Sequence, residues 1–327
     1  MNFLLQTYSP IHLFIIFFVF FVGIGCSLED KGIGIDNGFN DKPEGNSSDH
    51  YIFGDLSTYE GQLKYDLPNG YGVRRFSNGN VYKGQFRKGF AHGYGNLVYK
   101  KNPDLIEYTG GWKKGKKSGF GKLSLSNSSR LEGHWQNDFM VYGEYFSADG
   151  TRTLGKWQND KLSEGISFSP SGEEFSGRFD ENGGFLLGSL MMNNGALYFG
   201  AFREGALHGK GVLESPDGSV YTGDMVNGIK EGRGIIKDLD GSVYSGEFFN
   251  DLQHGHGYQL DPTGASYVGS WKKGLMHGSG TLDYGDGNSY SGEFTDGLAT
   301  GGYYYWSDGR KSRVFQDDNG EWQDLTE

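Results

Sequence analysis

The chain has 327 residues, with 57 glycines, 7 prolines, 16% aromatic residues and a formal net charge of −11. A composition so rich in glycine and aromatic residues favours an all-β repeat protein over a globular enzyme, and the acidic balance argues against nucleic-acid binding. The single cysteine excludes an intramolecular disulfide, and it excludes zinc sites built from four cysteines or from two cysteines and two histidines.

Residues 1–26 read as a processing segment. An apolar run from Leu13 to Gly25 ends directly at Cys26 and is too short for a spanning helix. The junction resembles a bacterial lipoprotein processing site, which implies that Cys26 is lipidated. The run departs from that pattern because no Lys or Arg precedes it and Gly23 replaces the usual Leu. A plain signal peptide or membrane anchor with an incidental cysteine is the alternative.

Residues 27–50 read as a flexible acidic tether. Acidic side chains outnumber lysines, and glycine, asparagine and serine fill most of the other positions. Too little apolar surface is available to offset the entropy of ordering this segment. A tether behind a lipidated cysteine would hold the following residues off a membrane surface.

Residues 51–302 contain eleven approximate copies of one unit, most of them 23 residues apart. A regular step of this length is the signature of a repeat architecture. The reference glycines are Gly61, Gly84, Gly110, Gly133, Gly155, Gly177, Gly200, Gly223, Gly246, Gly269 and Gly292.

Each unit predicts a β-hairpin. Tyr82, Gly84 and Phe86 alternate with the period of a strand, and a second alternating stretch, Gly93–Leu97, follows after a turn. Glycine recurring in phase within strands indicates close approach of a ring or backbone, so we expect aromatic rings above the glycines. Asn-Gly and Asp-Gly pairs, such as Asp217-Gly218, separate the units and predict turns with positive φ.

The motif resembles a known repeat. Tyr-x-Gly-x-Trp/Phe-x-x-Gly-x-x-His-Gly-x-Gly is complete in Tyr82–Gly95, Tyr198–Gly211 and Tyr267–Gly280, and it resembles the MORN repeat. The resemblance implies an all-β fold, an elongated, twisted, single antiparallel sheet of about eleven 23-residue hairpins. It also implies protein–protein assembly, often self-association, and lipid contact in some members.

One dense basic cluster interrupts this acidic chain. Lys113, Lys114, Lys116 and Lys117 surround a predicted hairpin turn. Solvated loop lysines are one reading, and contact with an anion or a phospholipid headgroup is the other.

The fourth to sixth units, about 131–192, keep the period but lose much of the motif. Leu131, Thr153 and Phe175 replace the opening tyrosine. The segment is either drift within a tolerant repeat or a bend or partner contact. We expect a partner contact to use a local excess of apolar side chains, some of them exposed. These are Phe185, Leu186, Leu187, Leu190, Met191 and Met192.

The last segment, 303–327, is predicted to form capping strands, because a repeat array needs an atypical end unit. No pattern indicates catalysis or a cofactor. His92, His208, His254 and His277 share one repeat position, so they are too far apart to bind one metal ion, and we expect them to support turns. The glycine motifs lie in strands rather than before a helix, unlike nucleotide-binding loops.

These observations predict a non-enzymatic, membrane-tethered repeat scaffold of the cell envelope, without a metal or cofactor. Its partner would be a protein or a second copy of the chain, and an N-terminal lipid anchor would hold it at a membrane. We expect an exported protein at the outer membrane or its periplasmic face. The alternative is a peripheral phospholipid-binding module that uses the lysines at 113–117.

Overall fold

The computed structural model describes residues 49–324, which form strands and turns but no helix. Cys26, the apolar run and most of the predicted tether lie outside these residues. The chain divides after Gly183 into two compact units. Each unit is an antiparallel β-structure in which every strand pairs with the next one along the chain, so the predicted all-β fold of consecutive hairpins is confirmed.

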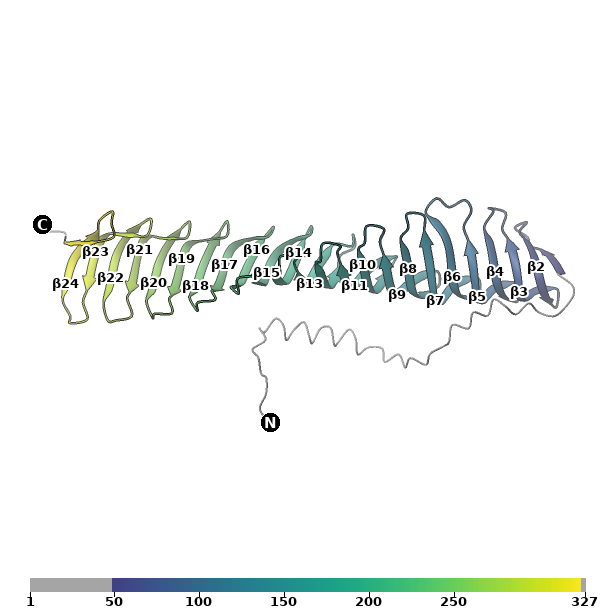
Figure 1. Cartoon of the computed structure of the whole chain (residues 1–327), viewed down its shortest axis with the longest axis horizontal. Coiled ribbons are helices and arrows are strands. Elements are labelled where there is room, and N and C mark those ends of the chain that lie inside the picture. The colour runs from purple at the N-terminus through teal and green to yellow at the C-terminus, as the bar shows by residue number, and fades with distance from the viewer. Residues whose placement is uncertain (1–48, 325–327) are drawn as a thin grey trace, which may run out of the picture. The chain divides into compact units, whose positions relative to one another are not determined.

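The first unit contains strands β1 to β12, drawn from purple to teal in Figure 1. Strand β1 begins at Asp49 and pairs with β2, so the ordered sheet starts two residues before the predicted boundary. The strands are β1 (Asp49–Ile52), β2 (Thr58–Lys64), β3 (Leu67–Arg75), β4 (Val81–Arg87), β5 (Phe90–Val98), β6 (Leu105–Lys113), β7 (Lys116–Leu125), β8 (Arg130–Gln136), β9 (Phe139–Phe146), β10 (Arg152–Gln158), β11 (Lys161–Phe168) and β12 (Glu174–Phe179).

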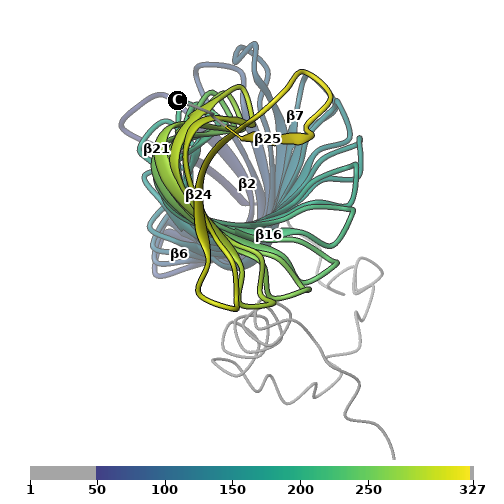
Figure 2. The same ribbon diagram turned by 90° about the vertical axis from the view of Figure 1, so that its left-hand side faces the viewer.

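The second unit contains strands β13 to β25. Figure 2 shows its green and yellow strands fanning around a common axis, so this sheet is twisted. The strands are β13 (Phe185–Met191), β14 (Leu197–Arg203), β15 (Ala206–Glu214), β16 (Val220–Val226), β17 (Ile229–Lys237), β18 (Val243–Phe249), β19 (Leu252–Leu260), β20 (Ser266–Lys272), β21 (Leu275–Asp283), β22 (Ser289–Thr295), β23 (Leu298–Tyr305), β24 (Lys311–Gln316) and β25 (Trp322–Asp324).

A row of paired glycines crosses the strands of each unit. In the second unit, Gly211 of β15 lies opposite Gly223 of β16, and Gly234 of β17 lies opposite Gly246 of β18. The ring of Tyr221 covers Gly223 and Gly234, and a Cβ atom at either glycine would overlap the ring or its hydroxyl. The tyrosine ring therefore occupies the space that the glycines leave, as the alternation predicted.

The tyrosine hydroxyl also fixes a bulge. In each of the eight repeats that open with tyrosine, the hydroxyl of this tyrosine donates to the backbone carbonyl of the residue three positions later. Examples are Tyr221 to Asp224 O at 2.7 Å and Tyr244 to Glu247 O at 2.9 Å. The register shifts at that point, between Gly246 and Glu247 in β18. The bulge turns the carbonyl toward the hydroxyl, so the buried tyrosine has a partner.

Aromatic side chains on the same face contact one another in ladders that cross several strands. In the second unit, Tyr221 contacts Phe248, Phe248 contacts Tyr244, and Tyr244 contacts Trp271, with edge-to-face geometry and centroid distances of 5.1 to 5.2 Å. Edge-to-face pairs at this distance are the favoured arrangement of aromatic rings. Tyr221 and Tyr244 are almost fully buried, so each sheet has its core on one face only.

Two kinds of turn join the strands. Between consecutive repeats, most turns contain a glycine with positive φ. Gly218 has a φ of +86°, its N–H donates to Ser215 O, and the Asp217 side chain accepts from Ser219 N. Within each repeat, a hairpin loop joins the two strands. In one of these loops, Asn227 and Gly228 both have positive φ and form a two-residue loop. The predicted Asp-Gly turn at Gly218 is confirmed.

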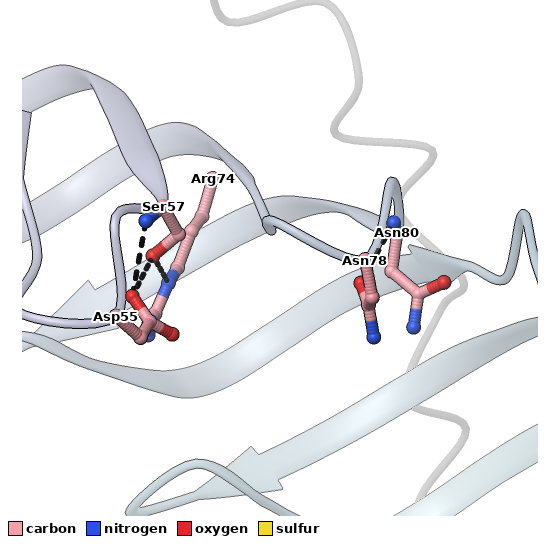
Figure 3. Close-up of polar contacts among 5 residues, drawn as sticks. All are labelled: Asp55, Ser57, Arg74, Asn78 and Asn80. Atoms are coloured by element: carbon pink, nitrogen blue, oxygen red, sulfur yellow. Dashed lines mark hydrogen bonds and ion pairs between the residues drawn. The ribbon is translucent and has the colours of Figure 1, made fainter.

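Polar contacts close the first turn of the array. Figure 3 shows Asp55, Ser57 and Arg74 in one network, in which Arg74 Nε donates to Ser57 Oγ at 2.8 Å and a second guanidinium nitrogen lies 2.9 Å from Asp55 Oδ2. The Arg74 guanidinium also stacks 3.6 Å above the centroid of the Phe53 ring. Hydrogen bonds from Ser57 hold the pKa of Asp55 below its usual value. This network covers the ring at the N-terminal edge of the first unit.

The C-terminal segment adds two strands after the last repeat. Tyr303 to Tyr305 still belong to β23 of the last repeat, and β24 and β25 follow. Trp322 of β25 lies 5.1 Å from the Tyr290 ring and 5.3 Å from the Tyr304 ring, measured between centroids. The last strand therefore ends the aromatic ladder of the second unit.

Replacing Tyr244 by Phe should destabilise the fold by about 1 kcal/mol, because the Glu247 carbonyl loses a buried hydrogen-bond donor. The matched control is Tyr258→Phe, which changes an exposed tyrosine of the same unit. Urea unfolding followed by circular dichroism measures both variants. Equal midpoints for the two would show that the tyrosine hydroxyl does not stabilise the bulge.

Stability should fall in alkaline solution. Burial raises the pKa of Tyr221, Tyr244 and Tyr267 to about 12, above the value of about 10 in an unfolded chain. Their protonated hydroxyls therefore contribute fully below pH 10, and the contribution is lost as the pH rises from about 10 to 12. Melting temperatures measured from pH 8 to pH 12 should decline above pH 10, and a constant melting temperature would contradict this prediction.

Candidate functional site

The face opposite the aromatic rings is the candidate site, and we call it the open face. Because neighbouring residues of a strand point to opposite sides, the residues before and after each row glycine lie on the open face. In the second unit these residues form two rows, one on each side of the glycines. The mixed row is Phe199, Val212, Thr222, Ile235 and Ser245, and the charged row is Lys210, Asp224, Arg233, Glu247 and His256.

All residues of the two rows except Asp224 line a groove on the second unit. It has a volume of about 690 Å³, and Leu187 and the glycines between the rows complete its lining. Ile235, at the centre of β17, is 48% exposed. The groove thus offers apolar surface beside a line of charges.

The charged row alternates in sign. Lys210 Nζ lies 2.8 Å from Asp224 Oδ1, and Asp224 Oδ2 accepts from the backbone N–H of Arg233. The hydrogen bond from Lys210 is the main cause that lowers the pKa of the Asp224 carboxyl. Glu247 accepts from the backbone N–H of His256 at 3.3 Å. The carboxylates are anchored to the sheet, which fixes where negative charge lies along the groove.

The predicted lysine cluster lies at the β6–β7 turn of the first unit. Lys113, Lys114 and Lys116 are exposed, but Lys117 is half-buried. Its ammonium lies 4.7 Å from the Trp135 ring centroid and 5.4 Å from that of Tyr108, and burial lowers its pKa. Lys117 therefore covers the aromatic ladder, and the three exposed lysines remain available to a ligand.

The apolar block of the second unit is divided between both faces. Leu186, Leu187 and Met191 are exposed, whereas Leu190 is 8% exposed and lies opposite Tyr198. Leu190 thus belongs to the core face, because it follows Gly188 at the spacing that places side chains beside the tyrosines. Leu187 lines the groove. Phe185 contacts the Phe202 ring, and Met192 is half-buried.

The repeat histidines lie beside the bulges rather than in turns. His254 lies opposite Glu247 at the register shift, and its carbonyl is 3.4 Å from the Tyr244 hydroxyl. The His254 ring lies 5.5 Å from the Phe249 ring, and His277 Nδ1 lies 3.7 Å from Asp296 Oδ1 of the β22–β23 loop, so a role in supporting turns stays a prediction. Among residues 49–324, no group of three or more His, Cys, Asp or Glu side chains is placed to hold a metal ion.

Sequence reasoning missed the two rows of the open face. The signal was present, because the residue between the glycines of each Gly-x-Gly is the one that faces this side. The motif is defined by the repeated residues, whereas the rows are formed by the variable ones, so the motif alone does not indicate them. The described residues also contain no helix long and apolar enough to cross a membrane.

Known proteins share these hairpins over limited stretches. Alsin of Rattus norvegicus is 36% identical over 84 residues, which cover 25% of this chain and 5% of Alsin. MORN repeat-containing protein 3 of Xenopus laevis is 36% identical over 76 residues, which cover 21% of this chain and 31% of that relative. The chain therefore matches well under half the length of either relative.

Likeness to solved structures is low. The TCP10 domain of CPAP from Danio rerio has 12% sequence identity and a TM-score of 0.29, over 68% of this chain and 94% of that chain. The TCP domain of SAS-4 from Drosophila melanogaster has 12% identity and a TM-score of 0.29, over 59% and 95% respectively. Neither likeness carries an argument about function.

The family comparison is decisive. The MORN repeat matches residues 59–81, 82–102, 108–130, 132–152, 198–220, 221–243, 244–266 and 267–289. The stretch from 153 to 197, where the opening tyrosine is missing, is not among these matches. Since the matches cover more than half of the 327 residues and fall on the hairpins that carry the glycine row, the chain belongs to the MORN repeat family.

Proposed function

We propose that this protein is a non-enzymatic scaffold that holds protein partners at the cell envelope and is tethered to a membrane through its N-terminal segment. The groove of the second unit is the observation that carries the proposal. MORN repeats typically serve as protein- or membrane-interaction modules, which agrees with this role. The tether rests on the sequence alone, on the apolar run and Cys26.

The groove suits a protein partner for two reasons. Ile235 and Phe199 are 48% and 38% exposed, and apolar surface gathered in one place marks interaction sites. The neighbouring Lys210, Asp224 and Glu247 alternate in sign, so a partner with the complementary pattern fits in one register. Apolar contact supplies affinity, and the charges supply specificity.

A second candidate, phospholipid binding, has an observation of its own. The exposed Lys113, Lys114 and Lys116 lie next to the β4–β5 turn, because Gly115 N donates to Ala91 O. Phe90, the first residue of β5 after that turn, is 56% exposed. Basic side chains beside an exposed ring are the combination found at membrane interfaces.

The groove can be tested by cross-linking in membranes. A photo-cross-linker at Thr222 should capture a partner from membranes, and Ile235→Glu should weaken the capture about tenfold, because it buries a charge in apolar contact. The control is Lys237→Glu, an exposed residue of the same strand that does not line the groove. Equal capture by the two variants would show that the groove is not the binding surface.

Membrane attachment can be separated into its two sources by fractionation at low and high salt. We expect Cys26→Ala to release the protein at any salt concentration, because the lipid anchor would be lost. A triple variant, Lys113→Glu, Lys114→Glu and Lys116→Glu, should remain attached if only the anchor acts. Release of this triple variant, together with release of the unaltered protein by high salt, would favour phospholipid binding instead, since salt screens headgroup attraction.

A further inference from the structure

The open face of the first unit carries a row of exposed aromatic rings. Tyr71, Tyr94, Phe120 and Tyr142 lie on β3, β5, β7 and β9, each next to a glycine of the row, and they are 48%, 51%, 58% and 41% exposed. They occupy the position that the charged row occupies in the second unit. The same position thus carries rings in one unit and charges in the other.

The fold does not require these rings. The equivalent positions of the second unit hold Lys210, Arg233, His256 and Ser279, and its strands keep the same glycine register. Four large apolar side chains on a solvent-facing row are therefore not explained by the core or by pairing. Exposed rings gathered in one line mark a surface that binds a ligand.

No Asp, Glu, Lys or Arg side chain lies between the rings. Gln85, Gly111 and His134 separate the four rings along the row. Gln85 is held in place, because its Oε1 accepts from Tyr94 N and its Nε2 donates to the Tyr71 hydroxyl. A Cβ atom at Gly111 would collide with the Ser118 carbonyl, so this gap stays open. The rings thus stand apart as separate platforms.

The spacing of the rings matches one kind of polymer. Rings on every second strand recur after about 9.6 Å, twice the distance between neighbouring strands. A polyproline II helix completes one turn of three residues in about 9.3 Å. Its proline rings project at this interval and pack on aromatic side chains in the known modes of recognition. Four rings correspond to roughly ten residues of such a helix.

We propose that the row Tyr71, Tyr94, Phe120 and Tyr142 binds a proline-rich segment of a partner protein in the polyproline II conformation. The inference rests on the proposed function, since it names a class of protein partner for the open face. Charge supports this occupant, because the row from Tyr71 to Tyr142 carries no Asp, Glu, Lys or Arg side chain. Across the glycines, Lys83 and Lys122 lie between Glu60 and Glu132, so the face lacks the basic excess that a nucleic acid requires.

The test uses the full-length chain and a fluorescent peptide of four Ala-Pro-Pro repeats, with four Ala-Gly-Ser repeats as the control peptide. Anisotropy should show binding of the first peptide only. The variant Tyr94→Ser/Phe120→Ser should bind about tenfold more weakly, because it removes two adjacent platforms. Serine is a fair replacement, since Ser279 occupies the equivalent place in the second unit. The control variant Tyr258→Ser/Tyr303→Ser removes two exposed tyrosines of the second unit that do not line the groove, and it should bind as before.

Three results would overturn the inference: no preference for the proline peptide, equal loss in both variants, or competition by a linear glycan such as chitohexaose but not by proline peptides. If the first variant loses its thermal transition, Tyr71→Ser/Tyr142→Ser provides the same comparison. Failure here, with cross-linking at Thr222 still sensitive to Ile235→Glu, would leave the scaffold proposal standing. Failure of that cross-linking result would count against the scaffold proposal itself.

Discussion

The contact between a tyrosine and a pair of glycines is the constraint on which the eight repeats that open with tyrosine depend. The Tyr244 ring covers Gly246 and Gly257, and its hydroxyl donates to Glu247 O. The ring needs two residues without side chains, which accounts for the glycine row. The hydroxyl needs a carbonyl turned toward the core face, which accounts for the bulge after Gly246. One side chain thereby determines both composition and register.

This contact also leaves the other face free. The aromatic volume lies on the side of Tyr244, Phe248 and Trp271, so substitutions on the open face do not disturb the ladder. The two units use that freedom differently, since the row that holds Tyr94 in one holds Arg233 in the other. In a repeat array each repeat contacts only the repeats beside it, so such differences accumulate without loss of the fold. Binding specificity can therefore be found in the variable residues rather than in the motif.

The sequence predicts what depends on local geometry. The period of Tyr-x-Gly gave the hairpins, and Asp217-Gly218 gave a turn with positive φ, because both signals come from neighbouring residues. It does not predict what depends on pairing between strands. Lys117 differs from Lys116 only through the register that places it opposite Trp112, and Leu190 is buried because it pairs with Tyr198. The open-face rows follow from the same register, so spacing alone did not reveal them.

The stretch without opening tyrosines shows how the first unit tolerates the loss of its main contact. Thr153 takes the place of a tyrosine, and its hydroxyl is buried without a partner. Gly155 still pairs with Gly143 and Gly165, so the glycine register persists without the ring. Trp157 compensates in part, because its indole N–H donates to Gly143 O at 3.0 Å and its ring lies 6.3 Å from that of Tyr145. The glycine row and the indole together hold strands that the tyrosine would otherwise fix, which explains how the period survives where the motif is lost.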